Sequence, residues 1–270
     1  MNKAEIDRQE IFKTIRRLAI EAGAKIMEIY DADDFEVKSK SDESPVTVAD
    51  ETADAHISAG LRAAFPQAPL VTEEQSDTHD LSVKTFFIVD PLDGTKEFIN
   101  RRGDFTVNIA WVVDGNPEMG VVYAPAKGRL FITDAKGVSH EEMGDHAADT
   151  VGELRPIRVS TPDEGGLNVV ASKSHLTEET KAYIDKYNVA DRVSAGSSLK
   201  FCLVATGEAD LYPRVGRTME WDTAAGQAVL QGAGGKVVRF DDHTPLTYGK
   251  NIFENPYFIA YAPGLTLQMP

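Results

Sequence analysis

An apolar run that ends in two acids is the part of the sequence that most suggests chemistry. Residues 86–98 read FFIVDPLDGTKEF, so Asp90 and Asp93 follow four apolar residues. Two carboxylates held together in a cleft repel each other unless they share a proton or bind a cation. A hard divalent cation is the simpler solution, and Mg²⁺ is the commonest such ion at phosphate sites. Gly94 and Thr95 precede an expected short helix whose first backbone N–H groups would face an anion, an arrangement suited to phosphoryl transfer.

Two further acidic positions fit the same site. The segment VTEE ends another apolar run and offers Glu73 or Glu74, and EWDTAAG places Asp222 just before an alanine-rich helix. Taken alone, Asp222 is more simply a helix cap, and Glu73 a solvated strand end. An Asx turn would also account for Asp90 and Asp93, although two acids behind an apolar run make that interpretation less attractive.

The same segment has a rival interpretation. An apolar strand followed by D-x-D-G-T is typical of phosphatases of the haloacid dehalogenase type, in which the first Asp is a covalent nucleophile. Here the segment reads D-P-L-D-G-T, with one more residue between the acids. Since side chains alternate along an extended chain, the additional residue points the second carboxylate in a different direction. The sequence therefore departs from that pattern.

Composition narrows the class of protein. The 270 residues are 42% hydrophobic and 26% charged, and a net charge of −15 argues against broad binding of nucleic-acid polymers. A small anionic ligand remains compatible with that charge where cations gather locally. The one cysteine, Cys202, allows no internal disulfide. Because no apolar run reaches membrane-spanning length and no signal peptide is evident, we expect a cytoplasmic protein.

Hydrophobic periodicity predicts the elements that position these residues. Apolar residues spaced three and four apart predict helices over residues 4–30 and from Pro45 to about Phe65, and five strands follow. Pro91 is expected to prevent its strand from continuing as a paired central one. Two helices on an antiparallel sheet would then form an N-terminal half, residues 1–150.

The rest of the chain has a different pattern. Residues 134–155 are weakly apolar, acidic and rich in turn formers, so they could be a boundary or a surface excursion. Strands and helices then alternate to about residue 240, which predicts an α/β arrangement for a C-terminal half, residues 151–270. We expect the site to lie between the two halves.

Three motifs in this order resemble the inositol monophosphatase superfamily: TEE, VDPLDGT and WDTAAG followed by GAGG. The resemblance extends from SPVTVAD to about residue 240. The segments DPLDGTKEFI, SKSH, GSSLKFC and LYPR make the chain most similar to the bacterial 3'(2'),5'-bisphosphate nucleotidases of the CysQ type. The resemblance implies the layered α-β-α-β-α sugar-phosphatase fold, which is an α/β (α+β) architecture. It also implies a lithium-sensitive, Mg²⁺-dependent phosphatase with two or three ions per site.

The resemblance also assigns roles to single residues. Those that match the family's metal ligands are Glu73, Asp90, Leu92 (through its backbone carbonyl), Asp93 and Asp222. Thr95 matches a residue that orients the attacking water, and Asp50 matches its hydrogen-bonding partner. Asp50 could take up the proton that the water loses. Alternatively, Asp50 is simply a favourable acid in the first turn of a helix.

A nucleotide substrate carries a second phosphate and an adenine, which need their own contacts. The residues that match the family's substrate pocket are Gly94, Thr95, His175, Ser197, Lys200, Arg214 and Asp222, and Lys40 in the loop before Pro45 is a further candidate. Arg214 suits bidentate binding of phosphate. His175 and Ser197 could equally cap the helices that follow them, and Lys200 could be a surface lysine.

The resemblance implies hydrolysis of adenosine 3',5'-bisphosphate to AMP and phosphate, which clears a by-product of sulfate assimilation. Inositol 1-phosphate or another sugar monophosphate is the alternative substrate. A non-catalytic protein that binds Mg²⁺ or a nucleotide is the alternative of another class. The family contains monomers and dimers, so a homodimer is one option, and peripheral association with a membrane is another open question.

Overall fold

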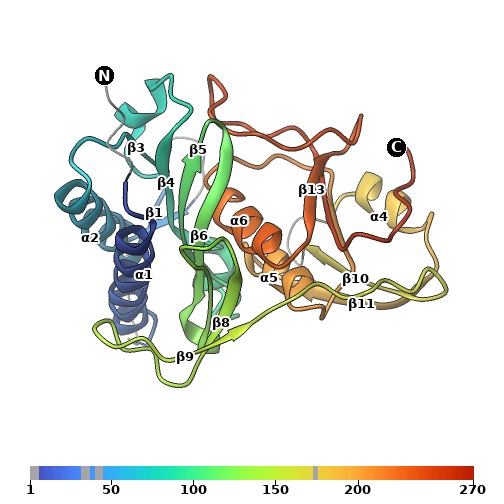
Figure 1. Cartoon of the computed structure of the whole chain (residues 1–270), viewed down its shortest axis with the longest axis horizontal. Helices are drawn as coiled ribbons and strands as arrows, with labels where there is room; N and C mark the ends of the chain where they lie inside the picture. Colours follow the sequence, from blue (N-terminus) through green and yellow to red (C-terminus); the bar gives the residue numbers. More distant parts are fainter. Residues whose placement is uncertain (1–5, 32–36, 40–44, 173–175) are drawn as a thin grey trace.

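Two β-sheets alternate with three layers of helices (Figure 1). The structure, a computed structural model, describes residues 6–31, 37–39, 45–172 and 176–270. Helices α1 and α2 cover one face of a seven-stranded sheet, and α5 and α6 lie between that sheet and a five-stranded sheet. Helix α4 lies on the far side of the smaller sheet. This order of layers is the α-β-α-β-α arrangement that the family resemblance implies.

The outer helices bury one apolar face against the large sheet. Helix α1 (Arg8–Tyr30) begins at the N-cap Asp7, whose side chain accepts a hydrogen bond from the Gln9 N–H. Helix α2 (Val48–Ala64) begins three residues later than predicted, because β2 (Pro45–Thr47) pairs with β1 (Val37–Ser39). Ile15 of α1 and Ile57 of α2 are among the fully buried residues that meet the sheet. The predicted helical periodicity is therefore confirmed for both segments.

The large sheet has the order β3-β4-β5-β6-β7-β8-β9, and every neighbouring pair except β3–β4 is antiparallel. Its strands are β3 (Leu70–Thr72), β4 (Phe86–Asp93), β5 (Thr106–Val113), β6 (Asn116–Ala124), β7 (Arg129–Thr133), β8 (Ser139–Met143) and β9 (Glu153–Pro156). Short 3₁₀ turns follow β3 (Ser76–Asp80) and β6 (Pro125–Lys127). Strands β8 and β9 occupy the segment that the sequence leaves as a boundary or a surface excursion.

The prediction that Pro91 ends its strand was wrong. Strand β4 continues through Pro91 to Asp93 and lies between β3 and β5. Asp90 pairs with Asn108 and Asp93 with Thr106, so β4 has one residue more than its partner over this stretch and forms a bulge. Because β3 pairs only as far as Val89, the missing N–H of the proline falls where the ladder is irregular.

The inner helices are buried on all sides. Helix α5 (Leu199–Ala205) contains only buried residues, and α6 (Ala224–Gly232) is nearly as buried. Small residues let α6 approach its neighbours: a Cβ at Gly120 of β6 would lie 2.7 Å from the carbonyl oxygen of Ala225. These helices therefore pack directly on the inner face of the large sheet.

The small sheet has the order β11-β10-β12-β14-β13, with parallel pairing around β10 and antiparallel pairing around β14. Its strands are β10 (Leu167–Ser172), β11 (Val189–Ala195), β12 (Leu211–Arg214), β13 (Lys236–Arg239) and β14 (Phe258–Tyr261), and α4 spans Glu178–Ile184. The sequence does not predict β14. A separate apolar core fills the space between this sheet and α4.

A buried ion pair joins α1 to the edge of the large sheet. Arg16 and Glu142 of β8 are 2% and 1% exposed, and Arg16 Nη2 lies 2.6 Å from Glu142 Oε1. Arg16 Nη2 also donates to the carbonyl oxygens of Ala147 and Thr150 at 2.8 and 2.7 Å. The ion pair therefore fixes the loop between β8 and β9 as well as the two elements.

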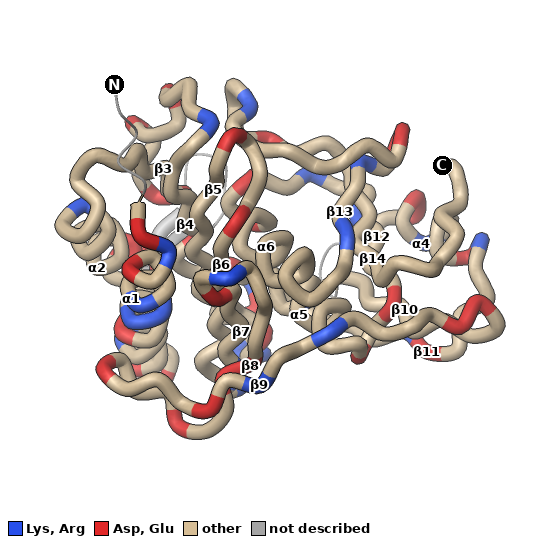
Figure 2. The backbone as a smooth tube through the Cα atoms, in the orientation of Figure 1, with Lys and Arg blue, Asp and Glu red and all other residues tan. Residues whose placement is uncertain are grey.

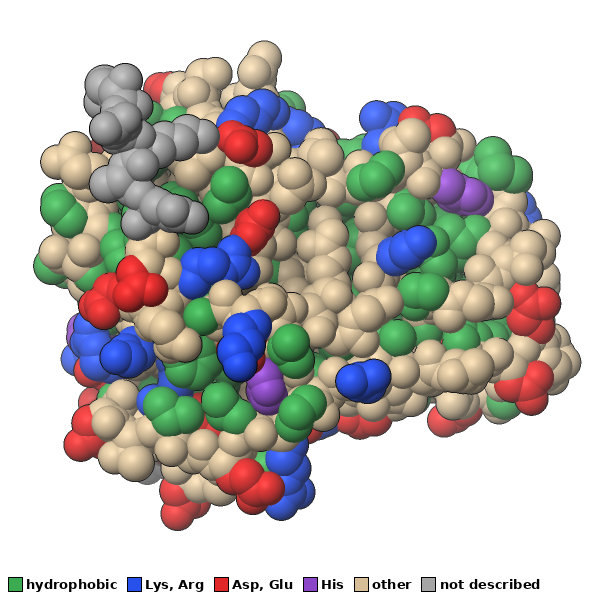
Figure 3. Space-filling model, in the orientation of Figure 1, with side chains coloured by type: hydrophobic (Ala, Val, Ile, Leu, Met, Phe, Trp, Pro, Cys, Tyr) green, Lys and Arg blue, Asp and Glu red, His purple; other side chains and the backbone are tan. Residues whose placement is uncertain are grey.

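Charged residues are spread over the whole chain. Figure 2 shows acidic positions on helices, strands and loops of both halves, and on the face in Figure 3 basic side chains are interspersed with them. Across the ranges that the structure describes, no helix combines the length and apolar character needed to cross a membrane.

Candidate active site

Three carboxylates converge where the large sheet meets α6. One oxygen each from Glu73, Asp90 and Asp222 lies within 4.8 Å of the others. Glu73 directly follows β3, Asp90 lies on β4 before the bulge, and Asp222 lies in the turn before α6. The fold thus brings together acids that are far apart in the sequence.

The cluster concentrates negative charge in a buried place. Asp90 is 1% exposed, and the Leu92 N–H donates to its Oδ1 at 3.1 Å. Burial, followed by the charges of Glu73 and Asp93, holds the pKa of Asp90 well above its usual range. Burial and the same two acids, Asp93 first, raise the pKa of Asp222 to about 8. Burial and the neighbouring acids therefore favour the protonated form of both groups, although the charge of Arg214 opposes the shift at Asp222.

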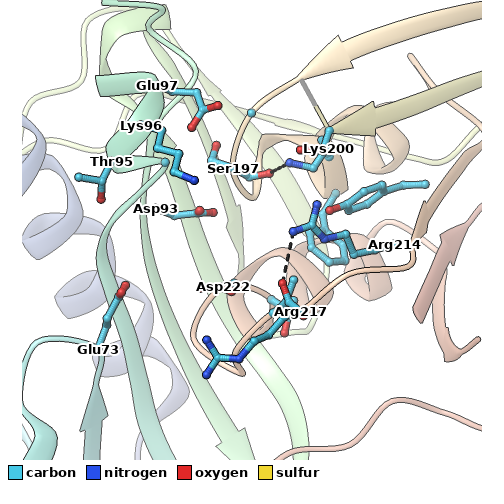
Figure 4. A pocket seen from close by; sticks show the side chains of 17 residues that line it. Glu73, Asp93, Thr95, Lys96, Glu97, Ser197, Lys200, Arg214, Arg217 and Asp222 are labelled. Atoms are coloured by element: carbon cyan, nitrogen blue, oxygen red, sulfur yellow. Dashed lines mark hydrogen bonds between the residues drawn. The ribbon is translucent and has the colours of Figure 1, made fainter. Parts of the chain in front are cut away.

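The simpler interpretation of Asp222, as the cap of α6, is wrong. The N-cap position is Thr223, and Asp222 Oδ2 instead accepts a hydrogen bond from the Met219 N–H at 2.7 Å. This contact closes a tight turn that directs the carboxylate toward Glu73. Figure 4 labels Glu73, Asp93 and Asp222 around the same cavity.

Asp93 lies beside the three-carboxylate cluster and is held by hydrogen bonds from both halves of the chain. Its Oδ2 accepts hydrogen bonds from the Ser198 N–H at 2.5 Å and from Asn108 Nδ2 at 3.3 Å. Burial raises the pKa of Asp93, while the nearby Lys200 and these hydrogen bonds oppose the shift. Ser198 also donates from its hydroxyl to the Asp222 backbone oxygen at 2.6 Å, so one residue holds two of the predicted ligands.

The donor set fits a divalent cation. All the side-chain donors are carboxylate oxygens, the type of ligand that Mg²⁺ prefers, and the raised pKa values of Asp90 and Asp222, caused by burial and by neighbouring acids, are what a cation would offset. The backbone carbonyl of Leu92 lies on the same turn and accepts a hydrogen bond from Thr95 Oγ1 at 3.4 Å. The cluster could therefore hold a metal ion.

The turn after β4 supplies the predicted water-orienting hydroxyl. Gly94 has φ 94°, a left-handed conformation that favours glycine, and Thr95 then opens the short helix α3 (Thr95–Ile99) as predicted. Asp50 is 1% exposed in the first turn of α2, and its charge is among those that raise the pKa of Asp90. Asp50 therefore lies within electrostatic range of the cluster.

Cationic side chains line the cavity beside the acids. The cavity has a volume of about 280 Å³, and Lys200, Arg214 and Arg217 line it together with Glu73, Asp93 and Asp222 (Figure 4). The acids and the cations come from both halves of the chain. A cavity with a metal-binding side and a basic side suits a phosphorylated ligand.

Lys200 is a buried cation rather than a surface lysine. It is 5% exposed, its Nζ donates to the Ser197 carbonyl at 2.5 Å, and its Nζ lies 5.3 Å from the centre of the Tyr212 ring. Burial lowers the pKa of Lys200 to about 8, and the charge of Asp93 opposes that shift. Lys200 therefore keeps its charge most readily while Asp93 is ionised.

The structure describes Ser197 and Arg214, but not all of the other residues predicted to line the pocket. Ser197 has φ 48° in the turn before α5, and its Oγ accepts a long hydrogen bond, 3.4 Å, from the Leu199 N–H. Arg214 Nη2 donates to the Arg217 carbonyl oxygen at 3.3 Å. His175 and Lys40 lie outside the described residues.

Sequence reasoning missed Ser198, Tyr212 and Arg217. Arg217 follows Arg214 by three residues in YPRVGR, and Ser198 is the second serine of GSSLK, so a closer reading of both motifs could have found them. The position of Tyr212 under Lys200 depends on the packing of α5 against β12, which no local pattern indicates.

Comparison with known proteins extends beyond these motifs. The model of the inositol monophosphatase family matches residues 7–263. The chain belongs to the inositol monophosphatase family. The family that the sequence predicts is therefore confirmed over almost the entire chain.

Relatives within the inositol monophosphatase family are similar over their full length. The 3'(2'),5'-bisphosphate nucleotidases CysQ of Escherichia coli O157:H7 and Salmonella typhimurium are 43% and 40% identical to the chain, over 90% and 92% of it and 96% and 98% of their own sequences. The crystal structure of CysQ from Bacteroides thetaiotaomicron, 38% identical, covers 96% of this chain and 98% of its own with a TM-score of 0.81. An inositol monophosphatase from Anabaena, 23% identical, shares the fold with a TM-score of 0.73, covering 95% of this chain and 92% of its own. These similarities confirm the predicted fold.

Proposed function

We propose that the chain is a metal-dependent phosphatase that hydrolyses adenosine 3',5'-bisphosphate to AMP and phosphate, and so clears a by-product of sulfate assimilation. The observation that carries this proposal is a single cavity with carboxylates on one side and Lys200, Arg214 and Arg217 on another. Its relatives of about 40% identity are named as nucleotidases of this class. We also keep a cytoplasmic location and a homodimer as predictions, to be tested by fractionation and light scattering.

Glu73, Asp90 and Asp222 would hold Mg²⁺, with Asp93 and the Leu92 carbonyl as further ligands of a site for two or three ions. Bound Mg²⁺ supplies Lewis-acid chemistry: it polarises phosphate oxygens and makes water more acidic. The carboxylates supply the charge that retains the ion. Ser198 keeps Asp93 and Asp222 in place through its N–H and hydroxyl.

Thr95 and Asp50 would prepare the nucleophile. Thr95 would orient a water molecule toward phosphorus, and Asp50 would accept the proton that the water loses. The water oxygen forms the new bond to phosphorus while the bond to the 3' oxygen breaks in line with it, and the 3' oxygen leaves as a hydroxyl after taking a proton from solvent. Because the nucleophile is water and not a side chain, no phosphoenzyme forms. Asp50 is buried and close enough to Asp90 for its charge to raise the pKa of that residue, which supports a place for Asp50 beside the reacting groups.

Lys200, Arg214 and Arg217 would bind the phosphate that is not hydrolysed. Lys200 contributes a buried charge, and the guanidinium group of Arg214 suits bidentate contact with phosphate oxygens. Ser197 and His175 stay predicted contacts of the nucleotide, and Lys40 a predicted contact near the metals. This basic side of the cavity separates the proposed substrate from esters with one phosphate.

Phosphate release in the presence of Mg²⁺ tests the proposal directly. Adenosine 3',5'-bisphosphate and inositol 1-phosphate are compared side by side, each with and without Li⁺. We expect strong preference for the bisphosphate and loss of turnover with lithium. Preference for the inositol ester would support the metal site but contradict the role of the basic residues. Binding of Mg²⁺ and nucleotide without turnover would favour the non-catalytic alternative.

A further inference from the structure

One aromatic contact joins the two segments that carry Glu73 and Asp222. The ring of His79, in the 3₁₀ turn after β3, stacks on Trp221 with the ring centres 4.7 Å apart and the planes at 23°. His79 Nε2 also lies 2.8 Å from the Thr72 carbonyl oxygen. Thr72 directly precedes Glu73, and Trp221 directly precedes Asp222. His79 therefore contacts the immediate neighbour of each acid.

Glu73 and Asp222 each lie just outside a regular element, and the Glu73 N–H still donates to the Val89 carbonyl oxygen at 3.2 Å. Glu73 follows β3, a three-residue strand at the edge of the large sheet. Asp222 lies in a turn before α6 begins. The two segments come from different halves of the chain, and like charges whose oxygens lie within 4.8 Å of one another repel. A contact that bridges the two segments would therefore help to keep the acids close.

The Glu73 side of this contact is anchored in the N-terminal half. The Thr72 N–H donates to Thr78 Oγ1 at 3.2 Å, and the Thr72 hydroxyl donates to the buried carboxylate of Asp54 on α2. Gln75 Nε2 donates to the other oxygen of Asp54 at 2.6 Å. The turn that carries His79 is thus fixed to α2, the helix that also carries Asp50.

The Asp222 side is anchored in the C-terminal half. Trp221 is 6% exposed, and its ring centre lies 6.4 Å from that of Phe253. Glu220, fully buried, accepts hydrogen bonds from the N–H groups of Gly249 and Lys250 at 2.7 and 2.9 Å. Each acid is therefore well connected to its own half, and the His79–Trp221 stack lies across the junction between them.

We propose that His79 is a positioning residue that keeps Glu73 and Asp222 at the separation needed to bind a divalent cation. The carbonyl of Thr72 can only accept, so His79 Nε2 donates the proton of that hydrogen bond. The flat His79 ring also stacks on the Trp221 ring, and so restricts the position of Trp221. This role rests on the proposed function of the carboxylates, and residues that orient metal ligands affect metal affinity about 10–100-fold when they are changed.

The test measures metal binding rather than turnover. Metal-free chain is titrated with Mg²⁺ by calorimetry, and the fluorescence of Trp221 is followed in a Trp111→Phe background. We expect His79→Ala to weaken Mg²⁺ binding about tenfold. His79→Phe keeps the stacked ring and His79→Gln keeps a donor, so each should lose less. At saturating Mg²⁺ the KM for the bisphosphate should stay within about twofold of its original value.

A matched control uses another half-buried histidine. His56 on α2 bonds to Glu21 of α1 at 2.8 Å, and neither residue lines the cavity, so His56→Ala should bind Mg²⁺ as the unmodified chain does. If His79→Ala folds and binds Mg²⁺ with unchanged affinity, the positioning role is overturned. If the alanine variant does not fold, unchanged Mg²⁺ affinity in both His79→Phe and His79→Gln overturns it. Because the readout is metal affinity, that result is distinguishable from a failure of the proposed reaction, which phosphate release reports.

Discussion

A substitution at Asp50 should affect the chemical step without affecting the binding of metal or nucleotide. Its carboxylate is buried near Asp90, but it is not part of the three-carboxylate cluster. Asp50→Asn removes the proposed proton acceptor at almost constant volume. We expect kcat for the bisphosphate to fall by about 10²–10⁴-fold while nucleotide binding, measured by calorimetry, persists.

The neighbouring Glu51 provides the control for that substitution. Glu51 is exposed in the same helical turn, and Glu51→Gln should leave kcat close to its original value. Turnover that survives Asp50→Asn would show that another group accepts the proton.

Asp222 should make the stability of the metal-free chain depend on pH. Its pKa is raised from 3.8 to about 8, so the folded state holds the proton more tightly than the unfolded state. Stability from this group is full below about pH 4 and is lost as the pH rises toward 8. We expect urea unfolding in EDTA to show a steeper loss over this range than in Asp222→Asn, by on the order of 1–3 kcal/mol. Parallel profiles for the two chains would contradict this linkage.

Arg217 should distinguish substrates with one and two phosphates. It lines the cavity, and its Nε lies 3.2 Å from Glu254 at the exposed rim. We expect Arg217→Gln to raise KM for the bisphosphate about fivefold, a modest effect because the side chain is exposed to solvent. The KM for adenosine 3'-monophosphate should be unaffected.

Glu254→Gln is the complementary change. It removes the competing partner of Arg217, so the KM for the bisphosphate should fall or stay constant. Equal effects of Arg217→Gln on both nucleotides would show that this arginine does not read the second phosphate.

Among the elements, the ion pair between α1 and β8 makes the clearest contribution to stability. Neutralising one partner of a buried pair leaves the other charge uncompensated, so Glu142→Gln should lower the free energy of unfolding by about 3 kcal/mol. Arg16, through charge-assisted hydrogen bonds, helps hold the pKa of Glu142 at about 2 against the opposing effect of burial. This contribution is present above about pH 4.5 and is lost as the pH falls toward 2.

Urea unfolding at pH 7 and pH 3 measures both effects. Glu153→Gln is the control, because its pair with Arg155 is exposed and should leave stability unchanged. A Glu142→Gln chain as stable as the original at pH 7 would show that the loop around Ala147 rearranges to accept the free guanidinium group.

Elements with strong periodicity could be predicted, and those defined by their surroundings could not. The apolar faces of α1 and α2 are visible in the sequence because each packs on a sheet. Strand β9 has largely exposed residues at the sheet edge, so it carries no apolar alternation to detect. Strand β4 passes through Pro91 because a bulge tolerates the missing N–H. The strand propensities of individual residues do not indicate where a bulge will form.

The residues of the candidate site also fall into those that the sequence could predict and those that it could not. Asp90, Asp93 and Thr95 belong to one local motif, whose chemistry could be inferred from residue types and spacing. The approach of Asp222 to within 4.8 Å of Glu73 and Asp90 depends on how α6 packs on β6, which is a property of the tertiary structure. The resemblance to a family, rather than local pattern, linked these segments before the structure did.

At the scale of the molecule, metal binding should act on the whole fold. The cluster joins β3 and β4 to the turn before α6, so an ion held there binds the folded state and not the unfolded chain. At Mg²⁺ about 100-fold above its dissociation constant, the gain in stability is about 2.7 kcal/mol. We expect a rise of roughly 5 °C or more in the thermal midpoint, reversed by EDTA.

Asp90→Asn tests the origin of that rise. Losing this ligand should abolish the Mg²⁺-dependent increase, and removing repulsion should leave the metal-free variant at least as stable as the original chain. A rise of the same size in Asp90→Asn would place the stabilising ion elsewhere.

Helices α5 and α6 also determine the order in which the chain can mature on the ribosome. The large sheet is complete at Pro156, but its inner face, with buried residues such as Val112, Val122 and Phe131, is covered by helices that end at Gly232. A nascent chain that has emerged only through β9 therefore exposes an apolar sheet face to solvent. Translation must proceed about half as far again before that face is buried, which makes this interval the period of greatest need for a chaperone.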